Sequence, residues 1–104
     1  MPERRLAPRF AFGGVAEITI VNPDTYMIVQ TSDLSRHGCF VRTRAIMLIG
    51  TKFGLKITHN GEAFNASGEV AYALPENGMG IKFSATASDD EALLEVWLGQ
   101  ATKS

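Results

Sequence analysis

The chain has 104 residues, of which 45% are apolar and 20% charged, and its formal net charge is −1. These values fit one soluble globular domain and argue against disorder. No apolar run approaches the ~20 residues that cross a bilayer, no secretion signal is recognisable, and one cysteine excludes an internal disulfide and a cysteine-based metal site. We therefore expect a reducing, cytoplasmic setting without membrane insertion.

Six segments in chain order have the composition or period-two alternation typical of β-strands. The first two are separated by Asn22-Pro23-Asp24, and the fourth and fifth by Asn60-Gly61, a strong hairpin signal. Gly68 interrupts the fifth segment and predicts a bend or bulge there. The expected strands are 15–21, 26–34, 39–43, 52–58, 63–72 and 79–83.

The last segment, 88–100, has a helical period instead. Ser88 and Glu91 have capping-box spacing, and Gly99 is a candidate helix end. An apolar stripe on this helix consists of Leu93, Leu94, Trp97 and Leu98. The sequence predicts a mainly all-β fold, a small six-stranded antiparallel barrel with one C-terminal helix, because closing the sheet removes its open edges.

All six arginines lie within residues 1–44, and three of them, Arg4, Arg5 and Arg9, lie in the stretch RRLAPRF. Arginine offers a planar fork for bidentate contacts, so this distribution indicates a planar anionic partner. Phe10 and Phe12 are expected to anchor the end of this arginine arm in the core.

A second polar stretch, DLSRHG at 33–38, is predicted to form a turn. Asp33 and Ser35 can hydrogen-bond the nearby backbone, and Gly38 can supply a positive φ or a close backbone approach. His37 and His59 have no partner at catalytic or metal-ligand spacing, and no nucleophile or phosphate-loop motif is present. The sequence therefore predicts a binding protein without a metal or cofactor, not an enzyme.

Together, RLAPR at 5–9 and DLSRHG at 33–38 reproduce the RxxxR and [D/N]xSxxG signature of PilZ domains, which the chain resembles along its entire length. GMGIKF at 78–83 is similar to the closing strand of that family. The resemblance implies one domain over 1–104, with an arginine arm at 1–10, a six-stranded barrel at 15–83 and a helix at 88–99.

The resemblance further implies a bacterial receptor for cyclic di-GMP that changes conformation on binding and regulates a protein partner, with motility or exopolysaccharide synthesis among the outputs. It assigns ligand contacts to Arg5, Arg9, Asp33, Ser35 and Gly38, and Arg4 and Gly80 are further candidates. In this family the residue before the arm motif is thought to influence whether one ligand molecule or a stacked pair binds, and Arg4 favours the pair. The residue types fit the ligand, because an arginine fork matches guanine O6 and N7 or a phosphate, and a carboxylate accepts from guanine N–H donors.

Two other functions remain open from the residues. A small-barrel nucleic-acid-binding domain would use the arginines as a backbone track, but the sequence pI near 6.1 counts against it. The second alternative is a PilZ-like domain that binds a protein and does not use the ligand.

Overall fold

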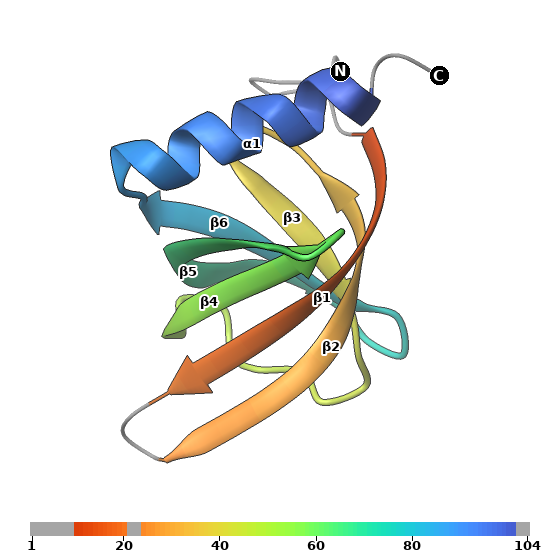
Figure 1. Ribbon diagram of the computed structural model, residues 1–104. Coiled ribbons are helices and arrows are strands. Elements are labelled where there is room, and N and C mark those ends of the chain that lie inside the picture. Colours follow the sequence, from red (N-terminus) through yellow and green to blue (C-terminus); the bar gives the residue numbers. More distant parts are fainter. Residues whose placement is uncertain (1–9, 21–23, 102–104) are drawn as a thin grey trace, which may run out of the picture.

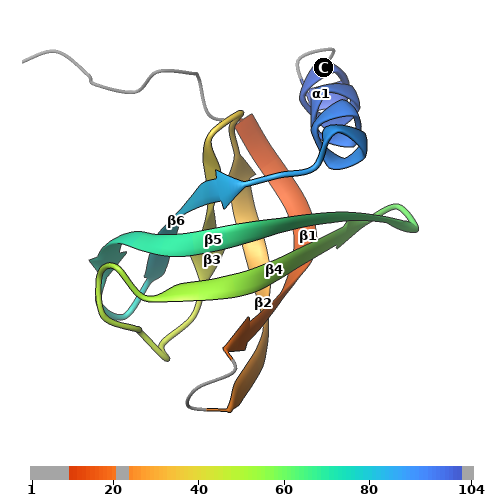
Figure 2. The ribbon, with the colours of Figure 1, turned by 90° about the vertical axis from the view of Figure 1, so that its left-hand side faces the viewer.

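The computed structural model describes residues 10–20 and 24–101, and these form a closed antiparallel barrel of six strands with one helix (Figures 1 and 2). Around the barrel the order is β1-β2-β3-β6-β5-β4. The elements are β1 (Phe10–Ile20), β2 (Thr25–Leu34), β3 (Gly38–Arg42), β4 (Lys52–His59), β5 (Glu62–Leu74), β6 (Gly78–Ala85) and α1 (Ser88–Ala101). The predicted fold class is confirmed.

The barrel begins five residues earlier than the sequence indicated, and Phe10 belongs to β1 and not to the arm. A register shift between Ala11 and Gly14 lets β1 continue through two glycines while it stays paired with β2. The hydroxyl of Thr31 on β2 donates to the Gly14 carbonyl at 3.0 Å and holds the two strands together there. Because a β-bulge interrupts the alternation, the period-two pattern is lost and the strand start is missed. At its other end the barrel extends to Ala85, beyond the predicted limit of 83.

The turn and bulge signals in β4 and β5 are confirmed. Asn60 and Gly61 have φ of 52° and 80°, the positive values that a two-residue hairpin turn requires. The register between β5 and β6 shifts at Ser67/Gly68, where a Cβ atom on Gly68 would lie 2.8 Å from the Phe53 ring.

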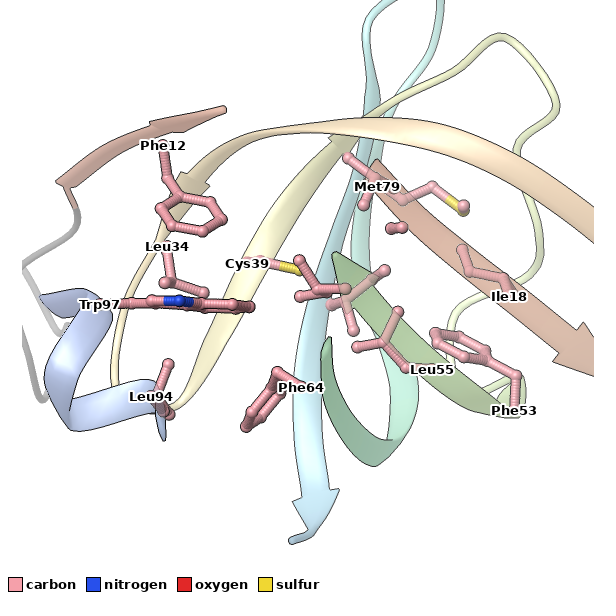
Figure 3. Packing of buried hydrophobic residues seen from close by; sticks show 14 of the residues in the cluster. Phe12, Ile18, Leu34, Cys39, Phe53, Leu55, Phe64, Met79, Leu94 and Trp97 are labelled. Atoms are coloured by element: carbon pink, nitrogen blue, oxygen red, sulfur yellow. The ribbon is translucent and has the colours of Figure 1, made fainter. Parts of the chain in front are cut away.

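Helix α1 lies across one end of the barrel (Figure 1). Its apolar stripe packs into the core and closes that end. Trp97, which is 1% exposed, is seated within the core 5.2 Å from the Phe12 ring and 6.2 Å from the Phe64 ring (Figure 3). Phe12 is also buried and Phe10 packs against the core, as predicted. Truncating a buried Trp costs about 3–5 kcal/mol, so the helix is part of the barrel's stability.

The ends of α1 differ from the sequence-based expectation. The amide N–H of Glu91 donates to the Ala87 carbonyl at 2.9 Å, so Ser88 already belongs to the first turn and is not the N-cap. Gly99 does not end the helix, which continues to Ala101. Glycine inside a helix costs only about 1 kcal/mol relative to alanine, and the packing of Trp97 and Leu98 outweighs that cost. The α1 helix is too short to cross a membrane.

Candidate ligand-binding site

The turn between β2 and β3 is held together by Ser35. Its backbone N–H donates to the Gly38 carbonyl at 2.8 Å, and its hydroxyl donates to the same oxygen at 3.2 Å. The hydroxyl oxygen also accepts from the N–H groups of His37 and Gly38, both at 3.2 Å. One donor and two acceptor sites are the full capacity of a hydroxyl, and the side chain is only 4% exposed. Ser35 therefore acts on the shape of the turn.

Gly38 is needed for the approach of β6. A Cβ atom at this position would collide with the Ile81 carbonyl oxygen, and Gly38 is paired with Lys82 across the β3–β6 ladder. The expected positive φ is not found here, since the described glycines with positive φ are Gly50 and Gly61. The close backbone approach at Gly38 is made by a neighbouring strand.

Asp33 lies on the outer face of the barrel beside this turn. The next residue, Leu34, is fully buried in the core, so the alternation of β2 turns Asp33 outward. Asp33 is half-buried and pairs with Ala11 on β1 and Phe40 on β3.

The arginines of the arm, Arg4, Arg5 and Arg9, lie outside the described residues. The chain enters the barrel at Phe10, whose Cα pairs with Leu34, the residue between Asp33 and Ser35. The start of β1 and the polar turn are thus neighbours in space, although they are separated by more than twenty residues in the sequence.

Gly80, a predicted ligand contact, is covered by an aromatic side chain. A Cβ atom on Gly80 would collide with the ring of Tyr72 on β5, which lies over it. The Phe40 ring lies beside the Tyr72 ring, with centroids 6.2 Å apart and planes inclined by 30°. The sequence analysis did not predict that the Phe40 and Tyr72 rings lie beside Gly80. The signal that could have found them is Gly78-x-Gly80 on one face of a strand, which leaves room for neighbouring side chains.

Arg36 connects the polar turn to helix α1. Its Nη2 lies 2.9 Å from Glu95 Oε1, and the two side chains are 59% and 53% exposed. Ion pairs this exposed contribute about 0–1 kcal/mol. A hollow beside this pair is lined by Thr86, Ser88, Glu91, Ala92 and Leu94 as well as by Arg36 and Glu95.

The sequence matches the family model described as PilZ domain over residues 3–100. The chain belongs to the PilZ domain family. The resemblance inferred from the two-part signature is therefore confirmed. A search of curated protein sequences found no match for this PilZ domain.

Solved structures share the fold. The PilZ domain with c-di-GMP of YcgR from Escherichia coli matches with a TM-score of 0.75 and 12% identity, over 97% of this chain and 93% of that one. The Bacillus subtilis inhibitor of motility matches with a TM-score of 0.74 and 17% identity, over 99% of this chain and 54% of that one. The PilZ domain of CeSA from a cellulose-synthesizing bacterium matches with a TM-score of 0.65 and 17% identity, over 89% of this chain and 97% of that one. This PilZ domain thus spans nearly all of two of these chains and about half of the motility inhibitor.

Proposed function

We propose that this PilZ domain is a cytoplasmic bacterial receptor for cyclic di-GMP, not an enzyme, and that the ligand lies between the arginine arm and the outer face of β2 and β3. The observation that carries the proposal is the pairing of Phe10 with Leu34. This pairing brings the attachment point of the arm next to the turn that holds Asp33, Ser35 and Gly38.

Chain connectivity supports the reach of the arm. Arg9 directly precedes Phe10, so their Cα atoms are about 3.8 Å apart, and Arg5 lies within about 18 Å of Phe10 even in a fully extended chain. An arginine side chain from either position can therefore approach a ligand beside Asp33. The guanidinium groups supply charge-assisted contacts to phosphate or to guanine O6 and N7, and Asp33 supplies an acceptor for guanine N–H groups.

The residues divide into those that contact ligand and those that shape the site. Arg5, Arg9 and Asp33 are assigned direct contacts, with Arg4 as a further cation. Ser35 and Gly38 act through the turn geometry and the approach of β6. When the ligand draws the arm towards the barrel, the surface that a protein partner meets changes, and this change is the proposed signal.

Calorimetric titration of the full chain with cyclic di-GMP tests the proposal. We expect saturable binding, which Arg9→Ala weakens about tenfold or more, because each charge-assisted contact is worth roughly 1.5–3 kcal/mol. The matched control is Arg44→Ala, an exposed arginine in the loop after β3. Its binding should equal that of the parent.

The same titration reports how many ligand molecules bind, and with Arg4 before the motif we expect two per domain. A folded parent that does not bind cyclic di-GMP would refute the receptor function and favour a domain that only binds protein. Preference for a single-stranded polynucleotide, with affinity falling steeply as salt rises, would instead favour the nucleic-acid-binding function.

A further inference from the structure

Four residues form one row across the outer face of the barrel. Asp33 on β2 pairs with Phe40 on β3, Phe40 pairs with Gly80 on β6, and Gly80 pairs with Tyr72 on β5. The neighbours of Asp33, Phe40 and Gly80 along their strands lie in the core, which turns these three residues outward; the buried neighbours are Leu34, Cys39, Val41, Met79 and Ile81. Tyr72 follows a register shift in β5 and is itself exposed. A candidate ligand contact thus shares a row with two aromatic side chains.

The two rings cover the glycines of β6. The Tyr72 ring lies over Gly80, and a Cβ atom on Gly78 would lie 2.8 and 2.9 Å from two atoms of the Phe40 ring. The planes of both rings are within 30° of each other and the centroids are 6.2 Å apart, so the rings lie side by side on the surface of β6. We call this pair the aromatic floor. Tyr72 remains 39% exposed.

The aromatic floor has the chemistry of a base-binding surface. A flat ring that is covered on one face and open on the other accepts a nucleobase by stacking, which is worth about 1–3 kcal/mol per base. Paired residues in neighbouring antiparallel strands have Cβ atoms about 4.5–5.5 Å apart, so the Asp33 carboxylate stands at the edge of the floor, next to Phe40. A base that lies on the floor meets a carboxylate at its rim.

A carboxylate at that rim selects guanine. Guanine presents two adjacent donors, N1–H and N2–H, whereas adenine presents the acceptor N1 beside its N6 donor. An ionised carboxylate only accepts hydrogen bonds and has about four lone-pair sites, so Asp33 can take both guanine donors in addition to partners within the protein.

We propose that the aromatic floor of Phe40 and Tyr72 holds one guanine of the ligand by stacking, beside the Asp33 carboxylate to which the proposed function already assigns the N–H donors of the base. The inference rests on the proposed function and goes beyond it, because it assigns part of the binding affinity to stacking on the Tyr72 and Phe40 rings. Gly80 then contributes by letting the Tyr72 ring lie flat.

The first experiment replaces the ring. Tyr72→Leu keeps an apolar cover on Gly80 and removes the stacking surface, and we expect binding of cyclic di-GMP to weaken about tenfold to a hundredfold. Tyr72→Phe keeps the ring and should bind within twofold of the parent. The matched control is Tyr26→Leu, because Tyr26 is 57% exposed on the outer face of β2 and pairs with Thr19, far along the strand from Asp33.

The second experiment tests base selection. The parent should prefer cyclic di-GMP over cyclic di-AMP, and Asp33→Ala should reduce that preference about tenfold, since no side-chain acceptor would then face the guanine donors. In the parent itself, the ring proton resonances of Phe40 and Tyr72 should shift when the ligand saturates the protein. This measurement needs no variant and holds even if Tyr72→Leu does not fold.

The outcomes separate the two proposals. If the parent binds cyclic di-GMP and Tyr72→Leu binds equally well, or the ring resonances do not move, the floor is refuted while the receptor function stands. If the parent does not bind cyclic di-GMP, both proposals fail.

Discussion

Replacing Gly38 by alanine is expected to damage the fold before it affects any ligand. The added Cβ atom would collide with the carbonyl oxygen of Ile81, a backbone atom that cannot rotate away. Strands β3 and β6 must therefore separate near Gly38. Two backbone hydrogen bonds at this place would weaken: Phe83 N–H donates to the His37 carbonyl and Ser35 N–H to the Gly38 carbonyl, both at 2.8 Å. Overpacking costs about 1–3 kcal/mol and each weakened hydrogen bond about 0.5–1.5 kcal/mol.

We therefore expect Gly38→Ala to lower the free energy of unfolding by about 3 kcal/mol, a large part of the roughly 5–15 kcal/mol of a typical domain. For a domain of this size that is a fall in melting temperature on the order of 10–20 °C. Thermal unfolding followed by the fluorescence of Trp97 measures it, since this only tryptophan is buried between the helix and the barrel. Gly13→Ala is the control, because nothing lies within 4 Å of its Cβ position. A Gly38→Ala protein that melts within about 2 °C of the parent would show that β3 and β6 are not held this close.

Three other predictions concern residues in and around the barrel. Arg5→Ala is expected to weaken cyclic di-GMP binding about tenfold or more while the melting temperature of the free protein stays that of the parent, and calorimetry together with thermal unfolding checks both. Cys39 is fully buried, so its thiol should resist a thiol reagent in the native protein and react at once in denaturant; rapid native labelling would contradict this packing. The pKa of Tyr26 is raised above 10.0, mainly by the hydrogen bond that its hydroxyl donates to Glu17 at 2.8 Å, with smaller contributions from burial and the Glu17 charge. The folded state thus holds this proton more tightly than the unfolded state, so the stability it contributes is present below pH 10 and is lost as the pH rises through the raised pKa. Ultraviolet titration should show late ionisation of one tyrosine, which Tyr26→Phe abolishes.

Local signals in the sequence were sufficient for most of the strands and for the helix face. Alternation in β4, the Asn60-Gly61 turn and the apolar stripe around Trp97 each depend on residues close together in the chain. The closing contacts, β1 with β4 and β3 with β6, join segments far apart in sequence, and no local pattern specifies which strands meet. The bulge at Ala11/Gly14 hid the start of β1 for a related reason, because it breaks the period on which the prediction depended.

The candidate site was predictable where it follows a short motif and not where it depends on register. Asp33, Ser35 and Gly38 are close in sequence, so the turn could be expected, whereas the division of labour among them required the hydrogen bonds of Ser35 and the position of Ile81. The aromatic floor arises from pairing across β3, β6 and β5. A one-residue shift of any of these strands would bring a different residue into the row that begins at Asp33, and alternation alone does not fix the register.

The collisions at Gly38, in the family signature, and at Gly80, in the closing strand, bear on how sequence patterns are used to recognise function. Both glycines serve the barrel, so a lineage that has lost the nucleotide should retain them for as long as its barrel folds. The carboxylate at position 33 lies outside the core, so we expect it to drift first, together with the arginines that the proposed function assigns to the ligand. Sequence surveys that score the glycines together with the charged positions will therefore count too many receptors, and a survey weighted towards the arginines and the acidic position will separate binding members from those that keep only the fold.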